Sequence, residues 1–175
     1  MNGTAWQPRI AAFICNACAY RNGNATRLPI ELQEGNILGL HLGCSGSLDP
    51  QFVIRALAIG ADAVLVIGCH PDDCPHAEGN YRMLRRLNVV RRLLEQVGVP
   101  QERVRLEWIG SGDRQRIPKA VAEVVEAVRR LGPLKADGSA TTWERRMQQL
   151  GEAMGAQDIF QPAVPLAESL AGSLG

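Results

Sequence analysis

The sequence lacks long apolar runs, and its charges are almost balanced. No apolar stretch approaches the roughly 20 residues that a membrane-spanning helix needs, so we expect no membrane insertion. Nineteen Lys and Arg against 18 Asp and Glu leave a net charge of +1, which gives no overall attraction to nucleic acid. The first 15 residues have no basic segment ahead of a long apolar core, so no signal peptide is expected.

Short motifs of nucleotide-binding proteins and hydrolases are also missing. The chain has no phosphate-binding G-x-x-x-x-G-K-[ST], no G-x-S-x-G and no G-x-G-x-x-G. It does have five cysteines, an odd number, in a chain that is 46% hydrophobic and long enough to bury its own core. This combination argues against a secreted disulfide scaffold and favours a reducing cytoplasm, in which thiolates bind a metal.

The order of apolar segments predicts an α/β fold. Strands are expected over residues 9–14, 36–42, 63–67 and 104–109, and the main helices over 50–60, 77–97 and up to 131. A short, irregular helix is expected within 16–28. Alternating strands and helices with short links predict a three-layer, mostly parallel, four-stranded sheet of order 2-1-3-4, similar to flavodoxin. The last strand alternates apolar and charged residues, which is typical of an edge strand.

The character of the sequence changes after Pro133. We therefore divide the chain into an α/β domain, residues 1–133, and a C-terminal extension, residues 134–175. The extension begins with a polar linker and continues with a short helix over 142–150, which has Trp143, Met147 and Leu150 on one side. The tail from residue 157 is expected to lie over its own domain or against a partner.

Cysteines follow three of the predicted strands. Cys15, Cys44 and Cys69 each stand at the C-terminal end of a strand, and Cys18 and Cys74 lie just beyond. The C-terminal ends of parallel strands meet at one edge of a sheet, where ligand sites form. The order 2-1-3-4 places the first three strands side by side, roughly 5 Å apart. All five thiols are therefore predicted to converge on this edge.

Clustered thiolates select zinc, copper(I) or an iron–sulfur cluster. A two-iron, two-sulfur cluster needs four ligands, and two separate cysteine pairs supply them. One of the five thiols is then left over. A zinc site with help from His70 or His76 is an alternative, and so is dithiol exchange by Cys69 and Cys74 or by Cys15 and Cys18. His41 alternates within a strand and is expected in the core or on a face of the sheet. The simplest alternative is a set of ordinary buried thiols.

Three segments of the sequence together resemble one protein family. AFICNACAY, CSGSLDPQFVIRALAIGADAVLVIGCHPDDCPHAEGN and RRLLEQVGVPQERVRLEWIGSGD occur in this order and contain all five cysteines. They resemble the delta subunit of methyl-viologen-reducing (F420-non-reducing) hydrogenase, over roughly residues 9–132. The resemblance implies a non-catalytic subunit with one [2Fe–2S] cluster. It also implies that such a subunit passes electrons between a hydrogenase or other oxidoreductase and the A-type, flavin-bearing component of a heterodisulfide reductase.

The resemblance also carries a set of ligands. Its candidates are Cys15, Cys18, Cys44, Cys69 and Cys74, and the two close pairs predict Cys15, Cys18, Cys69 and Cys74 as the four ligands, with Cys44 as the fifth thiol. Two features depart from the family. Asp72 replaces a glycine after His-Pro, which changes the charge beside the site, and the residues after Pro133 lie outside the resemblance.

Overall fold

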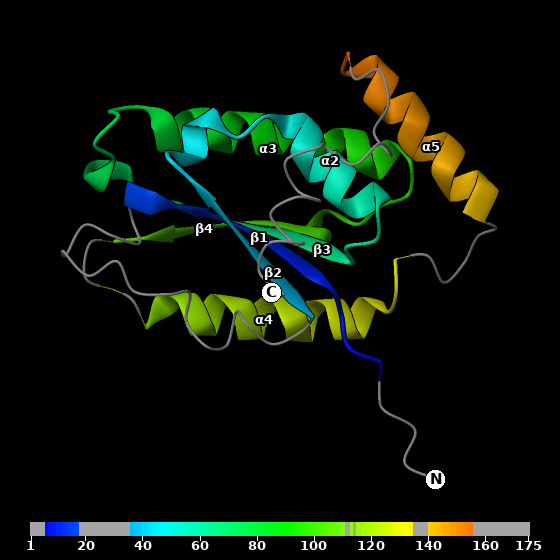
Figure 1. Ribbon diagram of the computed structural model, residues 1–175, viewed down its shortest axis with the longest axis horizontal. Coiled ribbons are helices and arrows are strands. Elements are labelled where there is room, and N and C mark those ends of the chain that lie inside the picture. The colour runs from blue at the N-terminus through cyan, green and yellow to red at the C-terminus, as the bar shows by residue number, and fades with distance from the viewer. Residues whose placement is uncertain (1–5, 18–35, 111–112, 114, 135–139, 156–175) are drawn as a thin grey trace, which may run out of the picture.

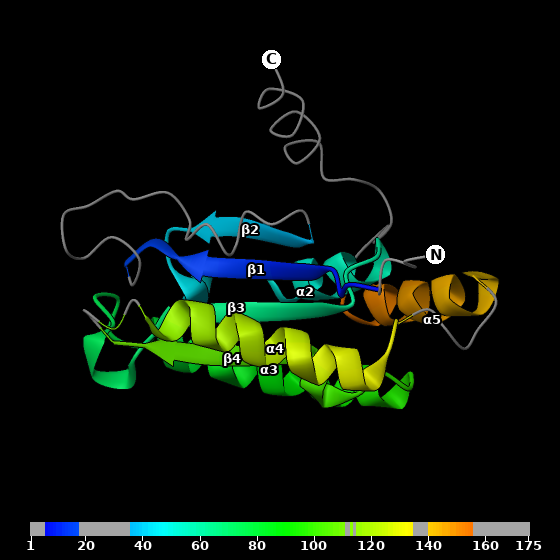
Figure 2. The ribbon, with the colours of Figure 1, turned by 90° about the horizontal axis from the view of Figure 1, so that it is seen from below.

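A four-stranded parallel sheet forms the centre of the molecule. The structure is a computed structural model, and it describes residues 6–17, 36–110, 113, 115–134 and 140–155. The sheet lies between layers of helices (Figure 1), and its strands are in the order β2-β1-β3-β4 (Figure 2). Each neighbouring pair runs parallel, which confirms the predicted order. Their bounds are Ile10–Cys15 for β1, Ile37–Leu42 for β2, Ala63–Cys69 for β3 and Val104–Ile109 for β4.

Helices cover both faces of the sheet and complete three layers. The helices α2 (Pro50–Ala58) and α3 (Gly79–Gln96) lie on one face, and α4 (Arg116–Leu131) lies on the other (Figure 1, Figure 2). Successive side chains of β1 point to opposite faces of the sheet, so this strand contributes to the apolar cluster on each face. Ala11 and Phe13 belong to the cluster under α2 and α3, whereas Ile10, Ala12 and Ile14 belong to the cluster under α4.

Helix starts follow the local chemistry of the sequence. The side chain of Asp49 accepts a hydrogen bond of 2.9 Å from the backbone N–H of Gln51, so α2 begins at Pro50 as predicted. The predicted helix over 77–97 begins instead at Gly79. Ala77 has a φ of 53°, in the left-handed region, and such a residue cannot extend a right-handed helix.

A buried polar network fastens the edge of the sheet where the strands begin. The carboxylate of Asp62 accepts hydrogen bonds from the backbone N–H groups of Arg9 (2.8 Å) and Leu134 (3.1 Å). The guanidinium of Arg103, which is buried, donates to the carbonyl oxygens of Asp62 (2.9 Å) and Gly132 (2.8 Å). These bonds satisfy backbone groups between elements and hold the start of the sheet in place.

The C-terminal extension contains the predicted helix in a longer form. This helix, α5 (Ala140–Ala153), buries Trp143, Met147 and Leu150 in the same apolar cluster as α2 and α3. The division at residue 133 stays a prediction. The predicted helix over 16–28 and the tail from 157 fall almost wholly outside the described residues. Within the described part of the chain, no helix has both the length and the apolar character to cross a membrane.

Candidate metal centre

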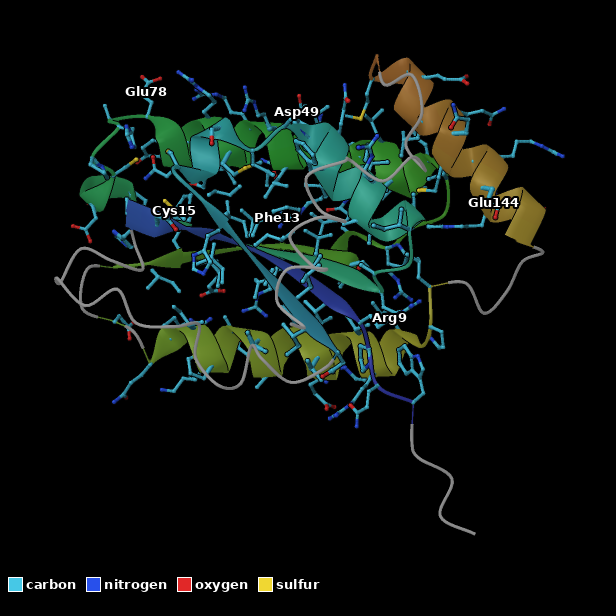
Figure 3. All side chains as sticks on the ribbon, viewed as in Figure 1. Arg9, Phe13, Cys15, Asp49, Glu78 and Glu144 are labelled. Carbon is cyan, nitrogen blue, oxygen red and sulfur yellow. The ribbon has the colours of Figure 1, made fainter. Side chains whose placement is uncertain are left out.

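Two cysteines meet where neighbouring strands end. Cys15 is the last residue of β1 and Cys69 the last of β3, and the register pairs Ile14 with Ile67 shortly before them. Their Sγ atoms lie 3.8 Å apart, and the side chains are 0% and 3% exposed. A separation of 3.8 Å is far longer than the roughly 2.05 Å of a disulfide. In Figure 3, Cys15 marks this end of β1, and Glu78 lies at the same end of the molecule.

A second pair of thiols lies beside the first, closer to solvent. Cys44 follows β2 and Cys74 follows the 3-10 turn Pro71–Asp73, and both are half-buried. The Cys44 thiol contacts the Cys74 thiol and lies within electrostatic range of Cys15. Four cysteines from three segments of the chain are thus brought together at one edge. Cys18 lies outside the described residues, so its place stays a prediction.

Glycine makes room for the outer pair of thiols. A Cβ atom on Gly79 would lie 2.6 Å from the Sγ of Cys44 and 3.3 Å from the Sγ of Cys74. The same kind of close approach occurs at Gly46, where a Cβ would lie 2.7 Å from the backbone of Gly79. The loop after β2 and the start of α3 therefore touch backbone to backbone, and the two sulfur atoms occupy the space that a side chain would fill.

One buried amide holds the turn after Cys69. The side-chain amide nitrogen of Asn80 lies within hydrogen-bond distance of the carbonyl oxygens of Cys69 (3.3 Å), His70 (3.1 Å) and Pro71 (3.2 Å). The side-chain oxygen of Asn80 accepts from the N–H of Tyr81 at 2.8 Å, within the first turn of α3. Asn80 is 1% exposed. It thus joins the turn between Cys69 and Cys74 to the start of one helix.

An arginine holds the loop of Cys44 in a similar way. Arg86 of α3 donates from Nη1 to the carbonyl oxygens of Gly46 (2.8 Å) and Leu48 (3.1 Å). The sequence shows Arg86 only as one charge among several on a helix, and Asn80 only as a polar residue near a helix start. Sequence reasoning missed both. The one sequence feature that could have identified them is their position, since each residue lies in α3 within a few turns of the cysteine motif.

Burial and neighbouring sulfur atoms affect the Cys44 thiol. Burial raises the pKa of this thiol above its ordinary value, and the nearby Cys15 and Cys74 thiols act in the same direction. The backbone N–H of Gly46 donates to the sulfur and lowers the pKa. A neighbouring cation or metal is the usual means of stabilising thiolates in such surroundings.

The histidines are exposed, but His76 lies near the outer thiols, since its Cβ is 3.7 Å from the Cβ position on Gly79 that approaches Cys44 and Cys74. His70 and His76 are exposed, and His41 lies exposed on β2 with its Nδ1 3.0 Å from the Oδ1 of Asn16. Within the described ranges, no three His, Cys, Asp or Glu side chains stand close enough to hold one metal ion. The described thiols are arranged as two neighbouring pairs, Cys15 with Cys69 and Cys44 with Cys74, and not as a closed tetrahedral group.

Together, the fold and the site define a class: an α/β protein whose parallel sheet gathers cysteines at one edge. The family of the methyl-viologen-reducing hydrogenase delta subunit matches residues 10–132. The chain belongs to this family. It is 37% identical over 130 residues to the D-type iron–sulfur subunit of F420-non-reducing hydrogenase from Archaeoglobus profundus, a match that covers 74% of this chain and 95% of the relative.

Two further relatives extend the comparison. The D-type vhc iron–sulfur subunit of F420-non-reducing hydrogenase from Methanococcus voltae is 32% identical over 128 residues, 73% of this chain and 89% of the relative. The A-type subunit of the ferredoxin:CoB-CoM heterodisulfide reductase from Methanosarcina mazei is 32% identical over 130 residues, 74% of this chain but only 16% of that protein. A region like this chain therefore occurs both as a separate subunit and as part of a much longer polypeptide.

Proposed function

We propose that this chain is a non-catalytic electron-transfer subunit that carries one [2Fe–2S] cluster. The observation that supports this proposal is the convergence of Cys15, Cys44, Cys69 and Cys74 on one edge of the sheet. Cys15 and Cys69, separated by 54 positions in the chain, meet there through the parallel topology. Scattered core cysteines would have no reason to meet at the strand ends.

The donor set and its shape fit a two-iron cluster. Thiolates are the usual ligands of such a cluster, two for each iron, and the described thiols form two neighbouring pairs. The absence of a side chain at Gly79 leaves the space that the two outer sulfur atoms occupy beside the start of α3. When bound, the cluster supplies a centre that takes up and releases one electron at a time.

The two pairs of thiols differ in burial, and this difference gives them different roles. Cys15 and Cys69 are buried and exclude water on the side of the sheet, whereas Cys44 and Cys74 are half-buried at the surface. The outer pair is therefore the side on which a partner's redox centre approaches. Asn80 and Arg86 hold the two loops in place, and the N–H of Gly46 offsets negative charge on Cys44.

The choice of four ligands is part of the proposal. The set taken from the sequence, Cys15, Cys18, Cys69 and Cys74, remains an untested prediction because Cys18 is outside the described residues. The contact between Cys44 and Cys74 favours a set that differs in one member. We propose Cys15, Cys44, Cys69 and Cys74 as ligands, with Cys18 as the fifth thiol.

The relatives support a place for this chain in a larger complex. Some are named as hydrogenase subunits, and others are A-type subunits of heterodisulfide reductases. In the latter, a region of this kind is joined covalently to the rest of a longer polypeptide. We propose that this chain docks onto an A-type flavin-bearing subunit and accepts electrons from a hydrogenase or another dehydrogenase. Its thiol-rich site is suited to the reducing cytoplasm, where we place the protein.

Anaerobic purification or reconstitution tests the proposal directly. We expect about two irons and two acid-labile sulfides per chain, with visible absorption and a paramagnetic signal after one-electron reduction. One equivalent of zinc without visible absorption would instead indicate a zinc-stabilised module. Dithiol exchange without iron would indicate a thiol–disulfide oxidoreductase, but the burial of Cys15 and Cys69 does not favour that activity.

A further inference from the structure

The outer thiols lie at the start of a strongly basic helix. α3 contains five arginines and one glutamate, a surplus of four positive charges in a chain whose net charge is +1. The residues outside α3 therefore include more acidic than basic side chains. Glu78, which directly precedes α3, lies at the same end of the molecule as Cys15 (Figure 3). Positive charge is thus concentrated on the element that begins beside Cys44 and Cys74.

Two of the five arginines have structural roles. Arg86 donates to carbonyl oxygens of the loop after Cys44, and the half-buried Arg91 donates from Nε to the carbonyl oxygen of Val104 at 2.8 Å. These two guanidinium groups therefore fasten α3 to neighbouring segments. The other three are exposed: Arg82, Arg85 and Arg92.

The exposed arginines gain little from the fold itself. Among the described residues, only Arg85 of the three forms an ion pair, 3.7 Å from Glu78, and these side chains are 66% and 72% exposed. Such a pair stabilises little, so its arginine is available to another carboxylate. Arg82 and Arg85 also lie in the first two turns of α3, where the helix dipole disfavours positive charge. Their placement does not favour helix stability, and this points to a role outside the fold.

The spacing of the exposed arginines places an apolar residue among them. Positions 82, 85, 89 and 92 are three or four residues apart, so they share one side of the helix. Val89 is 56% exposed within this set. We call these four residues the α3 stripe, which extends for about 15 Å along the helix. An apolar side chain with charged neighbours is typical of a protein-docking surface, whereas a phosphate surface would offer the valine no contact.

We propose that the α3 stripe is the surface on which an acidic patch of the flavin-bearing partner docks. The inference rests on the proposed function, which supplies that partner. Carboxylates of the partner pair with the three arginines, and an apolar side chain of the partner covers Val89. The stripe begins three residues after Gly79, against which the outer thiols lie. The docked partner is therefore beside the half-buried thiols and not beside the buried pair.

The uneven distribution of charge also orients the partner before contact. A basic helix at the thiols and an acidic surplus elsewhere give the molecule a dipole, which steers an acidic patch toward the stripe. Weak electron-transfer complexes have small interfaces, and steering of this kind raises their association rates. A symmetric contact with a second copy is not favoured, because it would place arginines against arginines.

Association kinetics of the iron-loaded full chain test the proposal. The probe is the purified A-type flavin-bearing subunit of the same organism, and binding is followed over a series of salt concentrations. Replacing Arg82→Gln, Arg85→Gln and Arg92→Gln together should lower the association rate constant about tenfold at low salt and flatten its salt dependence. The matched control removes the same net charge from exposed positions of α4 and α5 and should have a much smaller effect. It consists of Arg129→Gln, Arg130→Gln and Arg145→Gln.

The valine of the stripe is tested separately. Val89→Ser should leave the association rate nearly unchanged and raise the dissociation rate constant about fivefold, because short-range contacts act mainly on dissociation. Ile59→Ser is the control, since Ile59 is equally exposed at 56% but follows α2 and is not part of the stripe. Circular dichroism and iron content verify that every variant folds and holds its cluster.

The possible outcomes separate this proposal from the proposed function. Equal rates and salt dependences in the wild type and the stripe variant would overturn the docking surface and leave the proposed function intact. A wild-type chain that does not bind the flavin-bearing subunit would overturn both. Unchanged association with a shifted reduction potential would overturn the proposal in favour of a role for the arginines beside the cluster. Unchanged association with lost binding to anionic lipid vesicles would overturn it in favour of a membrane surface.

Discussion

The side-chain amide nitrogen of Asn80 lies 3.3 Å from the carbonyl oxygen of Cys69, and the same amide reaches the carbonyl oxygens of His70 and Pro71. A single buried side chain therefore fixes the backbone between the two cysteines of the turn. Asn80 therefore positions Cys69 and Cys74 through the backbone of the turn that joins them. In the described hydrogen bonds it does not contact either sulfur atom.

Asn80→Ala should destabilise the protein and loosen the site. The carbonyl oxygens of the turn lose the hydrogen bonds from this buried amide, which lowers the unfolding free energy by about 1–3 kcal/mol. We expect denaturant unfolding to show this loss, and the iron-loaded protein to show a shifted reduction potential. Asn88→Ala is the control on the same helix, since Asn88 is exposed and accepts only from Arg91 at 3.3 Å among the described bonds. A wild-type potential in Asn80→Ala would contradict a positioning role.

Gly79→Ala should displace the outer thiols. The added Cβ would lie 2.6 Å from the Sγ of Cys44, closer than any real contact allows. We expect a loss of about 1–3 kcal/mol in unfolding free energy, as for an overpacked site, together with less iron per chain after reconstitution. Gly43→Ala is the matched control beside Cys44, because no atom lies within 4 Å of its added Cβ and its φ is not in the left-handed region. Equal iron content in the two variants would contradict the arrangement of the site.

The strands and their order were predictable because the signal is local and strong. The apolar run of β3 admits few alternatives, and strand–helix alternation is typical of doubly wound parallel sheets, for which the flavodoxin-like order β2-β1-β3-β4 is a common one. The meeting of cysteines at one edge follows from the same topology. The start of α3 was predicted two residues early, because nothing in the sequence marks the left-handed conformation of Ala77.

The pairing of the thiols was harder to predict. Spacing along the chain suggests Cys15 with Cys18 and Cys69 with Cys74, which stays a prediction because Cys18 lies outside the described residues. The parallel register adds a neighbour that the spacing does not suggest, since it places Cys15 beside Cys69. Contacts between strands depend on lateral neighbours, which short sequence motifs do not contain. The roles of Asn80 and Arg86 were not predictable for the same reason, since both act on backbone carbonyl groups outside their own helix.

A partly exposed ion-pair group between β4 and α4 should make stability depend on pH. The pKa of Glu123 lies below its ordinary value because the carboxylate accepts hydrogen bonds from Arg116 and Arg105. A lowered folded-state pKa means that the contribution to stability is fully present above the unfolded-state pKa, about 4.3, and is lost as the pH falls through the folded-state pKa. We expect the difference in unfolding free energy between wild type and Glu123→Gln to be positive at about pH 6 and to shrink toward about pH 3.

The same experiment needs a charge control and a salt series. Glu126→Gln removes one carboxylate from α4 that makes only an exposed ion pair of 3.5 Å with Arg130 among the described contacts. Near neutral pH it should have a smaller effect than Glu123→Gln, which loses contacts with two arginines. High salt should reduce both effects, since the groups are exposed. A difference for Glu123→Gln that does not change with pH would contradict the role of its carboxylate.

Serine variants of Cys44 and Cys18 decide between the two ligand sets. Cys44 contacts Cys74 and lies within electrostatic range of Cys15, so we expect Cys44→Ser to lose most of the iron and the visible spectrum of the reconstituted protein. Cys18→Ser should keep about two irons per chain and a native paramagnetic signal. Cys15→Ser and Cys69→Ser belong to both sets and serve as positive controls for cluster loss. The reverse result, with iron lost in Cys18→Ser and kept in Cys44→Ser, would restore the set predicted from the sequence and would mean that Cys44 is not a ligand despite its contact with Cys74.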